Sequence, residues 1–485
     1  MYVSQTNLST SGRCKKLPLT AFTQTQCLVE QVDHEFHIKG RSVLGNTLDN
    51  AITRRMIELQ LMACRNDPTS LGRIPCAVHP DGSLHAGSPS LGEYHVRRAS
   101  EDTRTHAEMF LLTANIALAE NMWLHAAAAK DWGWLEKQVD GLEAALQWVE
   151  ENTDSQGRVW SDVYYEDQVI KDGRVAQAQA FAARAFSLAA EIESKLNRTA
   201  QAAHYSSVSE LLAQAMVAAL PTGYWNASAR RFVDWVDRLG QPHDHIHLLA
   251  NVLPVAFGYA TKAQADAVNS LVQQYHTDFQ RLPSFVARDI ANYSKSEIGS
   301  GGPYDLCAMG RVWVWDAAYW ASQQNGTMLK WQLERIGEET RTSNFTMAER
   351  YDMDYVYYKD GKDYHGAFGY YEYPAAFSWV LHHDLLGVRP SLTTDLELVP
   401  LLAESGSVTL NQRGIALRWV HDTAAGAFSI INLADKDRLL RVDLRGLGKG
   451  DSHERWSLRG QVAEFIHGSH VWLGALDALS FHRRP

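Results

Sequence analysis

Residues 344–387 hold many of the groups that could bind or react with a ligand. Carboxylates such as Glu349 alternate there with tyrosines, and the run 373–386 has apolar residues at helical spacing before Gly387. Loops this long are usually functional or disordered, and disordered segments are poor in aromatic rings. The pattern therefore predicts a binding loop anchored on a helix. Its candidate groups are Glu349, Arg350, Tyr351, His365 and Tyr371.

A second acidic loop reads DSQGRVWSDVYYEDQVIKDGR, from Asp154 to Arg174. Cleavage of a glycosidic bond needs a protonated carboxyl group on the leaving oxygen and a second carboxylate that activates water or attacks the sugar. Two acidic loops across one cavity can supply that pair, whereas either loop alone is more simply explained as solvated. Aromatic side chains favour ligand binding, because carbohydrate rings pack on their faces. The candidate groups here are Trp160, Asp162, Tyr164, Glu166, Asp167 and Arg174.

The run GRVWVWDAAYW, which begins at Gly310, places Trp313 and Trp320 about two helical turns apart on one face. Packing in a core explains these rings and Trp315 as well as stacking on a ligand does. Both interpretations therefore stay open for Trp313 and Trp315. The glycines before this run follow no strand and lack a GK[ST] ending, so a nucleotide-binding loop is not expected.

The run PHDHIHLL carries His243, His245 and His247. If a helix begins at His243, then His243 and His247 lie one turn apart on one face, but the glutamate of an HExxH site is missing and no third ligand is evident. A helix start with Asp244 in its first turn is the simpler interpretation. We therefore expect neither a metal ion nor an organic cofactor.

Helices must position these loops, and ten segments have the required apolar spacing. They are 42–65, 105–129, 132–152, 173–196, 199–220, 243–258, 262–275, 310–324, 327–341 and 373–386. The joints between them alternate short and long, which in a chain of antiparallel helices places every long loop at the same end. That end is the expected working face.

Such hairpins with one loop-rich face predict a toroid in which Ala-rich runs such as 176–190 permit close packing. A six-hairpin ring needs twelve helices, so either one pair lacks a clear pattern or residues before Ser42 supply a degenerate one. After Pro390, short alternating runs separated by Gly, Asn and Asp predict an antiparallel β-sandwich. The expected domains are 1–41, an N-terminal extension, 42–390, the helical toroid, and 391–485, the sandwich.

The chain of 485 residues is 45% hydrophobic and has a net charge of −10. Nucleic acids and anionic membranes bind basic patches, so neither is an expected partner. The N-terminus lacks the order of a signal peptide and no apolar run is long enough to span a bilayer, which predicts a cytoplasmic protein. Five widely spaced cysteines without a CxxC pair predict reduced thiols. Oligomeric state is not predictable from these features.

Several motifs together resemble the six-hairpin, (α/α)6-barrel glycosidases, which include α-L-rhamnosidases, trehalases, debranching glucosidases and maltose-type phosphorylases. They are the DxxGxVWSD loop before an Ala-rich helix, the GRVWVWDAAYW helix, the ERYD loop and the LLGVRP ending before the strands. The resemblance covers roughly residues 42–402 and is more specific for architecture than for substrate. It implies an inverting glycoside hydrolase whose substrate is a carbohydrate.

In that superfamily the general acid typically lies in the middle of the barrel sequence and the base in a later loop. Carried onto this chain, the resemblance implies that the acid is one of Asp162, Glu166 and Asp167 and that Glu349 is the base. It also implies that Trp160, Trp313 and Trp315 line a sugar subsite. An N-terminal β-domain that many relatives carry before the barrel is not visible in the sequence.

Three other functions compete with hydrolysis. An inverting phosphorylase would bind phosphate, for which Arg174, Arg311 and Arg350 are candidates. A polysaccharide lyase on a similar toroid would abstract a proton with Tyr371 and His365. A sugar-binding protein with an inactive site would bind without turnover.

Overall fold

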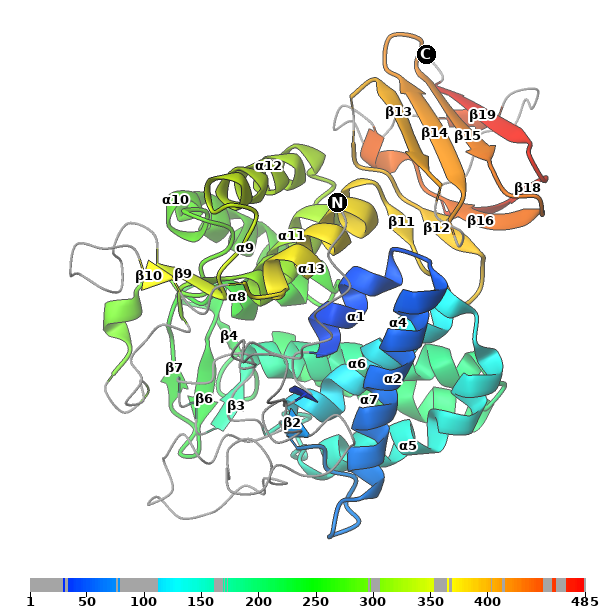
Figure 1. Ribbon diagram of the computed structural model, residues 1–485. Helices are drawn as coiled ribbons and strands as arrows, with labels where there is room; N and C mark the ends of the chain where they lie inside the picture. The colour runs from blue at the N-terminus through cyan, green and yellow to red at the C-terminus, as the bar shows by residue number, and fades with distance from the viewer. Residues whose placement is uncertain are drawn as a thin grey trace, which may run out of the picture.

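A computed structural model of the protein shows a large helical part, short strands on one side of it and two sheets formed by the C-terminal residues (Figure 1). Within the residues that it describes, no helix is both long enough and apolar enough to cross a bilayer. The described residues are 29–30, 34–75, 77–78, 112–160, 169, 171, 173–294, 297, 306–352, 364–365, 369–402, 404–411, 415–447, 456–458 and 468–483.

Helices occupy most of the predicted helical segments. They are α1 (His34–Ser42), α2 (Thr47–Arg65), α4 (Thr113–Ala129), α5 (Trp132–Glu151), α6 (Ala176–Lys195), α7 (Thr199–Val217), α8 (Leu248–Ala256), α9 (Lys262–Gln274), α10 (His276–Phe279), α11 (Gly310–Ser322), α12 (Gly326–Thr342) and α13 (Glu372–Trp379), which a π-helical segment, Val380–Leu385, continues. The apolar periodicity thus identified the right segments, with differences at their starts.

The predicted helix 42–65 is wrong as a single element, because the chain turns within its first residues. Gly45 has a φ of 64°, a left-handed conformation that is open to glycine without steric cost. Asn46 then caps α2, since its side chain accepts a hydrogen bond from the Asp49 amide at 2.9 Å. The residues before this turn form α1, which packs against α2, α4 and α13.

The predicted start of a helix at His243 is also wrong. His243 belongs to strand β7 (Pro242–His243), and α8 begins only at Leu248. His247 is the N-cap, with Nδ1 accepting a hydrogen bond from the Ala250 amide at 3.2 Å. His243 and His247 therefore do not share a helix face, and Asp244 lies outside the first turn of the helix.

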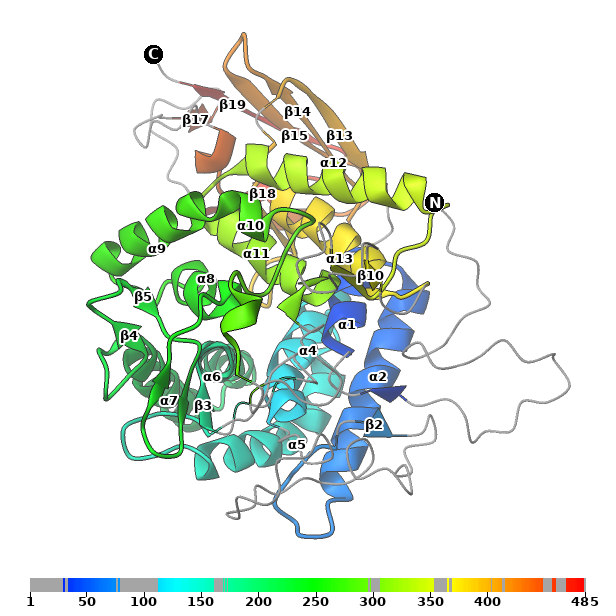
Figure 2. The same ribbon diagram turned by 90° about the vertical axis from the view of Figure 1, so that its left-hand side faces the viewer.

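Short connections join α1 to α2, α4 to α5, α6 to α7, α8 to α9 and α11 to α12, whereas longer ones precede α4, α6, α8, α11 and α13. Contacts run from α1 to α4, from α4 to α6, from α6 to α8, from α8 to α11 and from α11 to α13, and α13 also contacts α1. Figure 2 shows α2, α5, α7, α9 and α12 outside these inner helices. The long connections therefore all lead into inner helices.

Short strands lie where these connections meet the inner helices, on the left-hand side of Figure 1. One sheet has the order β3 (Gly173–Val175), β6 (Trp235–Asp237) and β7, and another has the order β10 (Tyr364–His365), β9 (Arg350–Asp352) and β8 (Ala308–Met309). Single bridges pair His247 with Ala287 and Phe285 with Ala308, so neighbouring connections are laterally joined. We call this side of the molecule the rim. Its other strands are β1 (Val29–Glu30), β2 (Ala77–Val78), β4 (Trp225–Asn226) and β5 (Arg231–Phe232).

The C-terminal residues form a four-stranded sheet of order β11-β12-β16-β18 and a five-stranded sheet of order β13-β14-β15-β19-β17. One hydrophobic cluster combines side chains of both sheets, for example Leu440 and Phe428. The expectation of a purely antiparallel arrangement is wrong in one pair, because β12 and β16 are parallel. The strands are β11 (Val388–Arg389), β12 (Leu396–Leu398), β13 (Gly406–Leu410), β14 (Leu417–Asp422), β15 (Ala427–Asn432), β16 (Arg438–Val442), β17 (Trp456–Leu458), β18 (Ser469–Leu473) and β19 (Ala478–Arg483).

Candidate active site

Glu349 stands at the rim, one residue before β9. Strand β9 pairs with β8, and β8 leads directly into α11, so the ladder fixes the Glu349 backbone above the first turn of that helix. The Glu349 side chain is 14% exposed, which leaves it open to solvent and supported by protein on its other sides. A carboxylate in that setting can receive a ligand from the rim.

Two arginines hold Glu349. Arg350 Nη1 lies 2.6 Å and Arg311 Nη2 3.8 Å from Glu349 Oε1. Arg311 is itself bound by the buried Glu372, to which it donates from Nε at 2.8 Å and from Nη2 as well. The Arg311 amide also donates to Glu372 Oε2 at 3.2 Å. Since Arg311 lies in the first turn of α11 and Glu372 begins α13, the ion pair joins two inner helices directly beneath Glu349.

A close approach of α11 to α13 makes this pairing possible. A Cβ atom on Gly310 would lie 2.7 Å from the Tyr373 amide nitrogen and 2.9 Å from Glu372 Cβ. Real Cβ atoms do not tolerate such distances, so only glycine fits here. The glycine that precedes Arg311 thus sets the distance between the two helix starts.

The tyrosines of this loop divide into packed and partly open rings. Tyr351 is fully buried, meets Tyr373 edge to face at 5.5 Å, and accepts a hydrogen bond from the Ala348 amide at 2.7 Å. Burial raises the pKa of Tyr351 to about 12, which keeps its hydroxyl protonated. Tyr371 is partly exposed and stacks on His37 of α1 at 3.9 Å. Tyr371 also stacks on Tyr370 at 4.7 Å, and it is the more exposed of the two rings, Tyr371 and Tyr351.

A buried charge network lies among the inner helices. Lys39 of α1 pairs with Glu35 at 3.0 Å and with Glu120 of α4, and Arg184 of α6 pairs with Glu120 at 2.8 Å. The Lys39 ammonium also lies 4.5 Å from the Trp315 ring centre, a cation–π contact. Burial raises the pKa of Glu120, but the charges of Lys39 and Arg184 outweigh burial and lower it to about 2. Trp315 therefore lies over a fixed set of charges among the inner helices.

Trp160 marks the other acidic loop. Its ring lies 4.8 Å from the Arg174 guanidinium carbon and 5.4 Å from that of Arg238. Arg174 Nε is 3.0 Å from Asp154 Oδ2, so β3 and the loop before it are tied together. Asp162, Tyr164, Glu166 and Asp167 lie outside the described residues.

Comparisons with known proteins agree with this architecture. No protein-family model matches the sequence, and no curated protein matches it. An α-L-rhamnosidase from Dictyoglumus thermophilum shares 11% identity at a TM-score of 0.52, covering 93% of this chain and 46% of its own. A GH63 mannosylglycerate hydrolase from Thermus thermophilus shares 12% identity at a TM-score of 0.51, covering 75% of this chain and 96% of its own. The chain has the fold of the six-hairpin glycosidases.

A GH78 rhamnosidase of Bacillus sp. GL1 also matches, with 12% identity and a TM-score of 0.50 over 86% of this chain and 41% of its own. The chain thus spans less than half the length of the two rhamnosidases. By contrast, nearly the whole GH63 hydrolase is covered. All three structures are of glycoside hydrolases that share this six-hairpin glycosidase fold.

Within that fold the predicted site residues separate into groups. Glu349 and Arg350 contact each other at the rim, Tyr371 stacks on His37 of α1, and Trp160 and Arg174 contact each other at the second loop. Trp313 is fully buried and its indole donates to Gln332 of α12 at 3.1 Å, a placement that favours packing over ligand contact. His365 belongs to β10, where its backbone pairs with that of Tyr351 in β9. The His365 side chain is not among the described parts of the structure.

Sequence reasoning did not select Glu372, Lys39 or Glu120 as site residues. The available signal was weak, because Lys39 and Glu372 lie outside the predicted helices and Glu120 is a single charged residue within one. Charged residues are almost never fully buried unless they are paired, and their partners here lie 61 and 81 positions away in the chain. A charge on the apolar face of the predicted helix 105–129 is the signal that could have identified Glu120.

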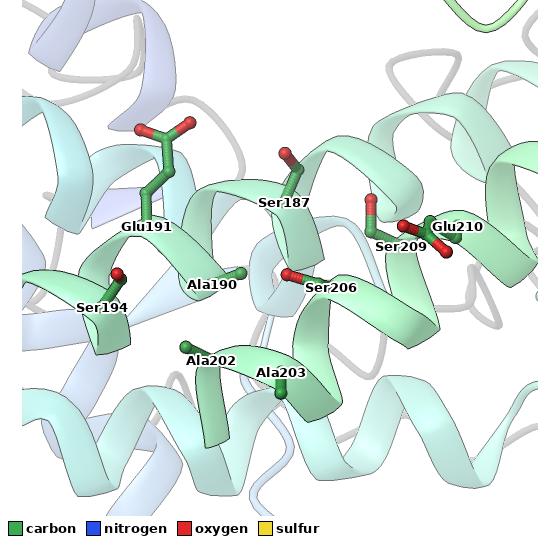
Figure 3. A pocket seen from close by; sticks show the side chains of 9 residues that line it. All are labelled: Ser187, Ala190, Glu191, Ser194, Ala202, Ala203, Ser206, Ser209 and Glu210. Atoms are coloured by element: carbon green, nitrogen blue, oxygen red, sulfur yellow. The ribbon is translucent and has the colours of Figure 1, made fainter. Parts of the chain in front are cut away.

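A shallow groove between α6 and α7 lies away from this site. Figure 3 shows small side chains of the two helices facing one another along it. Ser187 is roughly 16 Å along α6 from Ala176, at 1.5 Å per residue, and Ala176 is the end at the rim. The Ser209 hydroxyl donates a hydrogen bond to the Ala183 carbonyl at 2.8 Å. Close helix packing explains the groove. Its lining residues are Ser187, Ala190, Glu191, Ser194, Ala202, Ala203, Ser206, Ser209 and Glu210.

Proposed function

We propose that this protein is a glycoside hydrolase that cleaves an O-glycosidic bond of an oligo- or polysaccharide with inversion. The observation that carries this proposal is the fold shared with glycoside hydrolases, one of which is covered over 96% of its length. A partly exposed carboxylate, Glu349, at the rim adds the chemistry that such a reaction needs. No cofactor is required for this reaction.

The architecture that we propose is an (α/α)6 toroid followed by a β-sandwich. The circuit of contacts from α1 through α4, α6, α8, α11 and α13 back to α1 supports the toroid. The cluster shared by the two C-terminal sheets supports the sandwich. In this proposal residues 42–390, extended by α1 from His34, form the catalytic domain and 391–485 the second domain. The proposed location is cytoplasmic.

In the proposed mechanism Glu349 accepts a proton from water while that water forms a bond to the anomeric carbon. The bond from that carbon to the leaving oxygen breaks, and Asp162 or Glu166 gives this oxygen its proton. Inverting enzymes hold the two carboxyl groups about 6.5–9.5 Å apart, which leaves room for the water. Arg350 and Arg311 orient Glu349 through its Oε1 atom, so the other oxygen can face the water.

The proposed sugar subsites combine aromatic and polar groups. Ring faces stack on sugars, and arginine and aspartate side chains hydrogen-bond to hydroxyl groups. Trp313 is left out of the proposed contact residues because its indole nitrogen already donates to Gln332 of α12 at 3.1 Å. The proposed contact residues are Trp160, Tyr164, Asp167, Arg174, Trp315, Arg350, His365 and Tyr371, with Tyr351 supporting them.

A phosphorylase is less well supported than a hydrolase. Phosphate would need a guanidinium that is not already committed to a carboxylate. Arg174 pairs with Asp154, Arg311 with Glu372, and Arg350 with Glu349. These pairings favour water over phosphate as the attacking group.

The test is product release from a panel of aryl glycosides and oligosaccharides, with and without phosphate, for the unaltered protein and Glu349→Gln. We expect turnover without phosphate and a loss of about 100-fold to 10,000-fold in kcat for the variant, the range for removal of a general base. Glu404→Gln is the matched control, since Glu404 is 57% exposed and pairs only at the surface with Lys330.

Other results of this experiment would support a different catalytic residue or a different function. Unchanged turnover in Glu349→Gln removes this residue from the chemistry. Product that forms only with phosphate indicates a phosphorylase, and an unsaturated product that absorbs in the ultraviolet indicates a lyase. Saturable sugar binding without turnover indicates a binding protein.

A further inference from the structure

A second cluster of reactive side chains lies at the rim, in residues that the proposed hydrolysis does not use. It consists of His243 in β7, His245 just after it, and Glu297. His243 Nδ1 is 3.0 Å and His245 Nε2 is 2.6 Å from the same oxygen, Glu297 Oε1. Glu297 follows His243 by 54 positions and His245 by 52, so the cluster brings together two separate connections of the chain.

We propose that His243, His245 and Glu297 form a binding site for a divalent transition-metal ion, with Zn²⁺ as the best fit to the donor set. Two imidazoles and one carboxylate are the ligands of a recurrent class of three-residue zinc sites, which complete a tetrahedral shell with water. Oxygen-only ligand sets suit Mg²⁺ and Ca²⁺, whereas imidazole nitrogen favours zinc and its transition-metal neighbours. This inference is independent of the proposed glycosidase activity.

The separations fit one ion after small side-chain movements. The candidate ligand atoms all lie within 4.8 Å of one another. Ligands at about 2.0–2.1 Å from zinc are roughly 3.4 Å apart in a tetrahedron. The carboxylate would move back from the two imidazoles by less than about 1 Å, and ligand atoms that are as much as 4.8 Å apart would approach by roughly 1.4 Å, which side-chain rotations of the three residues can supply.

The surroundings hold each ligand in place. The His243 ring stacks on Trp235 at 3.7 Å, and its Nε2 lies 3.7 Å from Asp237 Oδ2. The His245 ring stacks on Tyr293 at 3.8 Å. The two stacks limit rotation of the histidine rings, and Asp237 is close enough to become the hydrogen-bonded outer carboxylate of His243 after a small side-chain movement.

Glu297 is held by groups that leave it able to bind a metal. Its Oε2 accepts the Ser294 amide at 2.7 Å, and its Oε1 accepts the Trp235 indole at 3.2 Å as well as facing the histidines. The Glu297 side chain is 5% exposed and that of His243 is 28% exposed. The site is thus built into the protein but open on the His243 side, where an ion can enter.

A carboxylate hydrogen-bonded by two neutral histidines is the competing explanation. It accounts for the two short contacts but requires both imidazoles to donate to a single oxygen. Under the metal hypothesis, binding would join the β6–β7 hairpin to the segment that carries Glu297. That cross-link would raise the melting temperature, because a ligand that binds only the folded state stabilises it.

The experiment uses the full-length, tag-free protein after dialysis against a chelator. Zn²⁺ alone is titrated by calorimetry into the unaltered protein, into His243→Ala and into Glu297→Gln. We expect one ion per chain and a loss of affinity of at least about 100-fold in each variant, since losing only an outer partner of a ligand costs 10–100-fold. Zn²⁺ should raise the melting temperature of the unaltered protein and should not raise that of His243→Ala or Glu297→Gln.

His204→Ala is the matched control. His204 of α7 forms an exposed pair with Glu150 of α5 at 2.8 Å, and the described residues place no third ligand there. Its Zn²⁺ affinity should equal that of the unaltered protein. The proposal is overturned if the unaltered protein binds no stoichiometric Zn²⁺, or if His243→Ala and Glu297→Gln bind it as tightly as His204→Ala does. Circular dichroism without metal identifies any variant that is not folded, and the remaining folded variant then decides.

Discussion

Arg311 and Glu372 form a buried ion pair between the first turns of α11 and α13, with Arg311 Nε donating to Glu372 Oε1 at 2.8 Å. The Arg311 amide donates to the other carboxylate oxygen at 3.2 Å. Both side chains are almost inaccessible to solvent, at 3% and 0% exposed. Because Arg311 also approaches Glu349, this pair connects the helix starts to the proposed catalytic carboxylate.

The first prediction concerns this pair. Glu372→Gln should lower the free energy of unfolding by about 3–5 kcal/mol, because the Arg311 charge would be left buried without its anionic partner. Denaturant unfolding at neutral pH measures the change. The double variant Arg311→Met with Glu372→Gln should recover part of the loss. If the single variant unfolds like the unaltered protein, the ion pair does not stabilise the fold.

The second prediction concerns the approach of α11 to α13. Gly310→Ala should destabilise the protein by about 1–3 kcal/mol, since the new Cβ would lie 2.7 Å from the Tyr373 amide nitrogen and the helices would have to separate. Gly337→Ala in α12 is the control, because a Cβ there meets nothing within 4 Å. That change should instead stabilise by about 0.5–1 kcal/mol through helix propensity. Equal melting temperatures for the two variants would contradict the close approach.

Much of the helical architecture was predictable because it depends on local patterns. Apolar residues at helical spacing located α5, which runs from Trp132 to Glu151, almost to its ends. The alternation of short and long joints also followed from the sequence. The break at Gly45 was missed because a hydrophobic pattern continues across it, and only the backbone shows that the chain turns there.

The site was predictable only in part, because its contacts are not local. The acidic, aromatic loop indicated Glu349 as a site residue. No sequence feature near Glu372 indicates that it pairs with Arg311, which is 61 positions away. The sequence showed no third ligand for His243 and His245, because Glu297 stands 54 positions after His243 and no local pattern connects them. The parallel pairing of β12 with β16 is likewise not encoded by either strand alone.

The third prediction concerns the buried network of Lys39, Glu120 and Arg184. Lys39→Met should lower the free energy of unfolding by about 3–5 kcal/mol, because Glu35 and Glu120 would lose the cation that they share. Arg54→Met is the control for removing a positive charge. Arg54 is 48% exposed where it pairs with Glu58, and its loss should cost at most about 0.5 kcal/mol. Urea unfolding of both variants measures the difference, and similar effects would show that burial of the Lys39 network adds nothing.

The last prediction concerns acid stability and His125 of α4. His125 is 2% exposed and meets Trp134 edge to face at 4.6 Å. Burial lowers the pKa of His125, Asp131 and Glu58 oppose that shift and Arg54 adds to it, and the resulting pKa is about 4. The unfolded chain, with an ordinary histidine pKa of about 6.5, therefore binds this proton first as the pH falls.

The folded state should accordingly lose stability between pH 6.5 and about 4, by about 3 kcal/mol from this group, at 1.36 kcal/mol per pKa unit. His125→Phe removes the titrating group, so its free energy of unfolding should fall less over this range than that of the unaltered protein. Urea unfolding at several pH values measures both slopes. His204→Gln, which changes a histidine that is 49% exposed, should keep the original slope. An identical acid dependence in His125→Phe would show that the buried imidazole does not control acid unfolding.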